Sequence, residues 1–210
     1  MTLVAVLASF TTLAAQPGSS VSAPGQGSAV AESFVKDNIA KSLTILINAG
    51  LSAQDRSQQL ESVLLGMTDT KRIATFTLGA YAQKASQADQ DAFAAAFQNY
   101  SVAVYRSYFA RFSGQTLTVS GSSQRTPDDI IVVTKLIDPH ASSGQAPLEV
   151  SFRVRTDAGK PVVTDLGVMG IWLALSQRDQ FVSYLNANGG SVPKLTTYVQ
   201  QVATQFASGR

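Results

Sequence analysis

Hydrophobic side chains recur at intervals of three and four residues through the first half of the chain, which is the spacing of one helix face. This pattern predicts a helix over 30–48, which ends at Gly50, a residue suited to the left-handed position after a helix. A second helix is expected over 54–67. A third is expected to begin after Asp69, whose side chain can cap it, and to end at Gly79.

A long helix is expected over 86–112. It opens with Ser86 and Asp89, which have the spacing of a capping box with Asp in place of Glu. Apolar side chains cover so much of its circumference that we expect burial on several sides. These side chains form two neighbouring stripes. One consists of Phe93, Phe97, Tyr100, Val104 and Tyr108, and the other of Val102, Tyr105 and Phe109.

The hydrophobic period changes to two residues after Gly114, as in a β-strand. Residues 157–160 have the composition of a hairpin turn. Strands are expected around 117–119 and over 129–137, 148–154 and 161–168. Two more helices are expected after them, one carrying Trp172 to Leu185 and the other Leu195 to Phe206. Helices, then an antiparallel sheet, then helices again indicate an α+β fold.

One face of the predicted sheet is apolar, because alternate residues of a strand share a face. The return strand should add Val162, Leu166 and Val168 to this face. The opposite register is the alternative, and we prefer the first because it points Asp165 away from the face. The Phe93 stripe of the long helix is expected to close the space above, leaving a cavity for an apolar ligand. The other residues expected on the inner face are Leu148, Val150, Phe152 and Val154.

The first 29 residues carry no charged side chain. Residues 1–15 form an apolar run shorter than the roughly 20 residues of a membrane-spanning helix, and small residues follow at its end. We interpret 1–15 as a signal peptide, although it lacks an initial Lys or Arg, with a buried helix as the alternative. Residues 16–29 are rich in Pro, Gly and Ser and are expected to form a flexible linker. The folded domain is then expected over 30–210.

Composition removes several classes of chemistry. The chain has no Cys and one His, which excludes thiol catalysis and a site built from several histidines. The net charge is only +2, and Lys and Arg are not clustered, so the sequence shows no basic surface for binding nucleic acid. His140 is expected in a solvated loop and Asp128-Asp129 in a turn. Arg153 and Arg155 are expected on a solvated sheet face, or on a patch for an anionic partner.

Three classes of function stay open at this point. The chain is apolar and lacks a recognisable catalytic constellation, which favours an exported binder of lipids or other hydrophobic ligands. A filled core would instead indicate an adaptor domain without ligand. An enzyme would need Asp or Tyr chemistry, such as Asp165 beside buried tyrosine hydroxyls.

The order of several motifs resembles that of the MlaC family, also called the toluene-tolerance family. The segment DTKRIATFTLG over 69–79 is similar to the family's Arg, apolar, Phe, Leu-Gly segment. Ser86 followed by the Phe93 stripe resembles the next helix of the family. The closing pattern is similar at 162–170, 177–181 and 188–190, so the resemblance runs from about residue 31 to residue 206.

This resemblance implies a curved antiparallel sheet wrapped by helices, like the nuclear-transport-factor cone, around an apolar cavity. It implies a soluble, monomeric periplasmic carrier without cofactor that holds phospholipid acyl chains. Its partners would be an inner-membrane ABC lipid transporter complex and an outer-membrane lipoprotein complex. The segment 100–105 is also similar to the hopanoid-associated branch. Met169 and Gly170 depart from the family pattern, which leaves phospholipid or hopanoid as the ligand.

Overall fold

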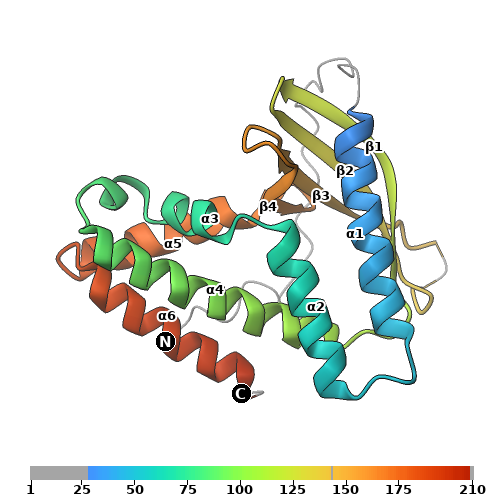
Figure 1. Cartoon of the computed structure of the whole chain (residues 1–210), viewed down its shortest axis with the longest axis horizontal. Helices are drawn as coiled ribbons and strands as arrows, with labels where there is room; N and C mark the ends of the chain where they lie inside the picture. The colour runs from blue at the N-terminus through green and yellow to red at the C-terminus, as the bar shows by residue number, and fades with distance from the viewer. Residues whose placement is uncertain (1–27, 143, 209–210) are drawn as a thin grey trace.

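A computed structural model of the chain describes residues 28–142 and 144–208 (Figure 1). The expected signal peptide and most of the expected linker lie outside these residues. Along these residues, helices come before the strands of the sheet and again after them, which confirms the α+β class. The helices are α1 (Ala29–Ile47), α2 (Ala53–Met67), α3 (Thr70–Thr77), the short 3₁₀ helix η2 (Gly79–Gln83), α4 (Gln87–Phe109), α5 (Leu173–Ala187) and α6 (Val192–Ala207).

The helices begin where short polar side chains accept hydrogen bonds from free backbone N–H groups. Asp69 caps α3 and Ser86 caps α4, as the sequence indicates. The Ser86 hydroxyl accepts a bond from the Asp89 N–H and donates one to the Asp89 carboxylate, at 3.1 and 2.7 Å. Ser28 caps α1, so the last residues of the expected linker already belong to this helix.

The sheet is a meander in which every strand pairs with its neighbours in sequence, in the order β1-β2-β3-β4-β5, and every pairing is antiparallel. The strand β1 is longer than its short apolar pattern suggests, and β5 was not expected at all. The strands are β1 (Thr116–Thr126), β2 (Asp129–Ile137), β3 (Leu148–Arg155), β4 (Val162–Val168) and β5 (Ile171–Trp172).

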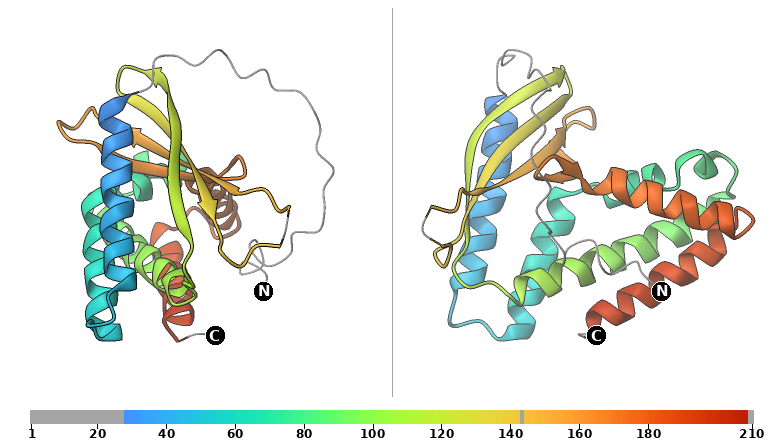
Figure 2. Two further views of the ribbon diagram at one scale, coloured as in Figure 1. Left: turned by 90° about the vertical axis from the view of Figure 1, so that its right-hand side faces the viewer. Right: turned by 180° about the vertical axis from the view of Figure 1, so that it is seen from behind.

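The described chain contains two separate hydrophobic cores, one between α1 and the sheet and one among the helices that lie to the side of the sheet (Figures 1 and 2 show the elements). In one, α1 lies along the sheet and buries Ala31 and Val35 against Val132 and its neighbours. In the other, α3, α4, α5 and α6 pack on one another. The α2–α3 junction joins the two parts, because the Asp69 N–H donates to the Val163 carbonyl of β4 at 3.2 Å.

From the sequence we expected Arg153 and Arg155 to lie on a solvated face of the sheet. In the structure both arginines form ion pairs with aspartates on that face. Arg153 donates two hydrogen bonds to Asp129, at 2.9 and 2.7 Å. Arg155 donates to Asp157 at 2.6 Å, and Arg72 of α3 holds the same carboxylate with two bonds. These guanidinium groups lower the pKa of both aspartates. Asp129 is buried, and its negative charge is balanced by Arg153 and Arg155.

Candidate functional site

The apolar face of the sheet combines side chains from β3 and β4 in the expected register. Val150 pairs with Val168, and Phe152 pairs with Leu166, so these four side chains share one face. A bulge follows, between Arg153 and Val154, where the register shifts by one residue.

This bulge corrects the expectation for Val162. Val162 pairs with Arg155 and so lies on the opposite face of the sheet. Val163 pairs with Val154 and occupies the position in the sheet core that we expected for Val162. The alternating pattern of β4 cannot be continued through the extra residue, so the face assigned to Val162 was wrong.

Burial along the apolar face changes from one end to the other. Phe152 and Val154 are buried in the core beneath α1. Val150, Leu166 and Val168 are half-buried, although they lie on the same face. The face is thus packed at the α1 end and partly open at the end near β5.

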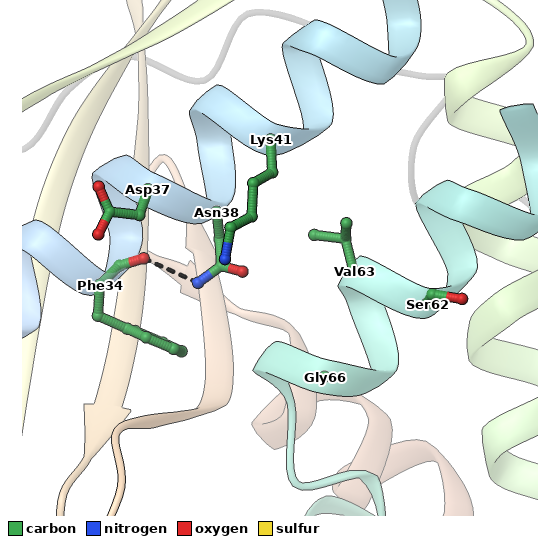
Figure 3. Close-up of a pocket in the computed structure, with 7 residues that line it drawn as sticks. All are labelled: Phe34, Asp37, Asn38, Lys41, Ser62, Val63 and Gly66. Carbon is green, nitrogen blue, oxygen red and sulfur yellow. Dashed lines mark hydrogen bonds between the residues drawn. The ribbon is translucent and has the colours of Figure 1, made fainter.

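A groove of about 400 Å³ opens between α1 and α2 (Figure 3). Lys41 and Asn38 extend from α1 into it, and Val63 extends toward them from α2. Phe34 lies at the end of the groove nearer the sheet and also packs against the sheet core. The groove is therefore apolar toward the sheet and polar at its rim. Its residues are Phe34, Asp37, Asn38, Lys41, Ser62, Val63 and Gly66.

The structure does not bring the Phe93 stripe of α4 onto the sheet. Phe93 and Phe97 lie in the helical core, where both meet Phe181 of α5 edge to face, with ring centroids 5.8 and 6.4 Å apart. Tyr100 packs against the same core, and its hydroxyl accepts a hydrogen bond from Gln177 at 3.0 Å. Val104 is half-buried, and Tyr108 at the end of the stripe is exposed.

The second stripe of α4 lies against α2 instead. Val102, Tyr105 and Phe109 line a small crevice of about 10 Å³ together with Leu60 and Leu64. Burial raises the pKa of the Tyr105 hydroxyl, and the negative charge of Asp165 adds to this effect. The periodicity of the sequence showed both stripes, but it did not show which one neighbours α2.

Asp165 lies on the face opposite Leu166, as expected, but it is buried. One of its oxygens accepts the N–H groups of Leu166 and Ala174, both at 2.8 Å. The second of these bonds satisfies a free donor at the start of α5, whose own cap residue, Trp172, supplies no side-chain bond. Burial raises the pKa of Asp165. The side chain has the role of a helix cap contributed by a neighbouring strand.

Other candidates for chemistry are dispersed. The His140 ring lies 3.2 Å from the Ser113 carbonyl in an exposed loop. Residues 28–142 and 144–208 contain no group of three His, Cys, Asp or Glu side chains that could hold a metal ion. In the same part of the chain, no helix has both the length and the hydropathy that crossing a membrane requires.

This architecture has been seen before in a solved structure. The structure matches a phospholipid-binding protein from Ralstonia solanacearum, solved in complex with a phospholipid, with a TM-score of 0.73 and 20% sequence identity. The match covers 85% of this chain and 99% of that one. The family model described as MlaC protein matches residues 36–201. The chain belongs to the MlaC family.

Proposed function

We propose that this protein is a periplasmic carrier that holds the acyl chains of a phospholipid. The observation that carries the proposal is the apolar sheet face, which is only half-buried at Val150, Leu166 and Val168. Val150 and Leu166 pack against the sheet core on one side and stay partly accessible on the other. Family membership and the phospholipid in the Ralstonia solanacearum protein support the same conclusion.

Physical chemistry explains what the open face contributes. Each CH₂ group that a lipid removes from water is worth about 0.8 kcal/mol, so an acyl chain strongly favours an apolar face. The groove between α1 and α2 has the size of a small-molecule pocket, for which roughly 300–1,000 Å³ is usual. Acyl chains would lie on the sheet face, and the polar end of the lipid would lie at the rim, near Lys41.

We further propose that the carrier exchanges lipid with an inner-membrane ABC transporter complex and an outer-membrane lipoprotein complex. Shielding a lipid needs no chemical step, so the energy for directional transport would come from these partners. Phospholipid is the favoured ligand, and a hopanoid is the alternative that analysis of the bound lipid would reveal. Burial and then the charge of Asp165 raise the pKa of the Tyr105 hydroxyl, which is the neighbourhood that an enzyme built on Asp and Tyr chemistry would need, but Asp165 accepts its hydrogen bonds from the N–H groups of Leu166 and Ala174.

The decisive experiment is analysis of the native protein. The mature chain is purified without detergent, extracted with organic solvent and examined by mass spectrometry, and the delipidated protein is then incubated with liposomes. We expect roughly stoichiometric phospholipid in the extract and renewed uptake from liposomes. A lipid-free extract together with no uptake would exclude the carrier and favour the adaptor.

Replacing Val150 by tryptophan tests the sheet face directly. The larger side chain remains apolar but occupies the space expected for an acyl chain, so lipid affinity should fall about tenfold, the equivalent of 1.4 kcal/mol. Lipid bound per folded protein is measured by mass spectrometry, and folding is followed by circular dichroism. Val30→Trp is the matched control, because Val30 is 63% exposed on α1.

Two results would count against this assignment. A folded Val150→Trp protein that binds as much lipid as the wild type would show that Val150 does not contact the ligand. Unfolding of this variant alone would show that the face is packed core, which favours an adaptor domain.

A further inference from the structure

The side of α1 that faces α2 presents two opposite charges to the groove between these helices. Three polar side chains follow Phe34 at the spacing of one helix face, and we call them the groove rim: Asp37, Asn38 and Lys41. Figure 3 shows them along α1, across the groove from Val63 of α2. The rim therefore offers a negative charge, an amide and a positive charge within little more than one helical turn.

The two charges of the groove rim are not used by the fold. Asp37 and Lys41 are four residues apart with the acid first, which is the favourable order for an ion pair on a helix. Among residues 28–142 and 144–208, however, the ion pairs involve neither of them. Both side chains are exposed, so both are accessible to a ligand in the groove.

Asn38 is held in an orientation that adds an acceptor to the rim. Its Nδ2 donates a hydrogen bond to the Phe34 carbonyl at 2.8 Å, which orients the amide and leaves Oδ1 as an acceptor. The Asp37 carboxylate offers acceptors only, and the Lys41 ammonium offers donors only. The rim thus fits a ligand that carries an anion for Lys41 and N–H donors for the two acceptors beside it.

The groove is continuous with the proposed lipid-binding face. The helix α1 packs on the sheet, and α2 ends at β4, where Thr68 forms a β-bridge with Val163. Phe34, at the sheet end of the groove, packs against the same core as Val150 and Leu166. A phospholipid with its acyl chains on this face can therefore place its headgroup at the groove rim.

We propose that the groove rim selects phospholipids whose headgroup carries a primary ammonium beside the phosphate, as in phosphatidylethanolamine. Lys41 pairs with the phosphate, and the Asp37 carboxylate and Asn38 Oδ1 accept hydrogen bonds from the ammonium. Phosphatidylglycerol has no ammonium for Asp37, and the quaternary ammonium of phosphatidylcholine has no N–H to donate. This inference rests on the proposed function, because it names the class of lipid that the carrier prefers.

Competition between headgroups tests this selectivity. Delipidated protein is incubated with liposomes that contain equal amounts of phosphatidylethanolamine, phosphatidylglycerol and phosphatidylcholine with identical acyl chains, and the bound lipid is extracted and quantified by mass spectrometry. We expect about fivefold more phosphatidylethanolamine than either competitor, a modest ratio because water screens exposed charges. The excess should decrease at roughly 0.5 M salt, where screening is stronger.

Two substitutions separate the roles of the two charges. Asp37→Asn keeps the shape of the side chain but removes the charge that faces the ammonium, so the excess of phosphatidylethanolamine should disappear. Lys41→Gln removes the partner of the phosphate, which all three lipids carry, so the binding of each should fall by the same factor, about threefold. Lys36→Gln is the matched control, because Lys36 is exposed on α1 but does not line the groove. Circular dichroism checks that each variant is folded.

Three results would overturn this selectivity and leave the carrier itself standing. The wild type could take up the three lipids in the proportions of the liposomes, Asp37→Asn could retain the excess of phosphatidylethanolamine, or Lys36→Gln could lower binding as much as Lys41→Gln. A wild type that takes up no phospholipid at all would contradict the proposed function, and the selectivity with it.

Discussion

Replacing Phe93 by alanine should lower the free energy of unfolding by about 4 kcal/mol without changing the lipid bound by each folded molecule. Phe93 is fully buried, and its ring lies 5.8 Å from Phe181 and 6.1 Å from Phe97. Truncation removes these contacts and leaves a cavity among helices that are held tightly together. Urea unfolding gives the stability, and mass spectrometry gives the lipid content.

This experiment decides between two roles for the Phe93 stripe. From the sequence we expected the stripe to close the lipid cavity, whereas in the structure Phe93 and Phe97 belong to the helical core. If folded Phe93→Ala protein loses its lipid, the stripe contacts the ligand despite its place in that core. Phe76→Ala is the matched control, because Phe76 is 40% exposed on α3 and its truncation should cost much less.

The features that were predictable from the sequence are those with local causes. The side chains that cap α3 and α4 are read from single residues, Asp69 and Ser86, because a capping bond joins groups close in sequence. The strand β2 is evident from its run of β-branched residues. The face on which Leu166 and Val168 lie follows from alternation along β4 and from the need to turn Asp165 away from it.

The features that escaped prediction depend on distant contacts or on unusual turn residues. The β4–β5 turn has Met169 where Asn would have indicated a hairpin, so β5 was missed. The bulge in β4 reversed the side on which Val162 lies. Hydrophobic periodicity gives the faces of a helix but not its neighbours, so both stripes of α4 were evident while their partners were not.

The ion pairs on the polar face are another contact that alternation does not reveal. Asp129 begins β2, twenty-four residues before Arg153, and the hairpin of β2 and β3 brings them together. From the sequence we expected a turn aspartate and solvated arginines. In the structure, Asp129 pairs with Arg155 across the two antiparallel strands. Arg153 lies two residues from Arg155 on the same face of β3, so both arginines reach the Asp129 carboxylate.

Replacing Asp129 by asparagine is expected to lower the free energy of unfolding by about 2 kcal/mol at pH 7. The substitution keeps the shape of the side chain but removes the charge that Arg153 and Arg155 face. The expected loss is smaller than for a fully buried pair, because the Arg153 side chain is 35% exposed and water screens it. Asp91→Asn is the control, since Asp91 and its partner Lys71 are both more than half exposed.

The effect should depend on pH in a defined direction. The pKa of Asp129 in the folded protein lies below the ordinary value of 3.8, first because Arg153 donates hydrogen bonds to the carboxylate. A lowered folded-state pKa stabilises the protein above about pH 4, and this contribution disappears as the pH falls through the folded-state pKa. The difference between wild type and Asp129→Asn should therefore shrink as the pH falls below about 4. Urea unfolding at a series of pH values measures it, and a difference that stays constant over this range would show that the Asp129 carboxylate has no special stability in the folded protein.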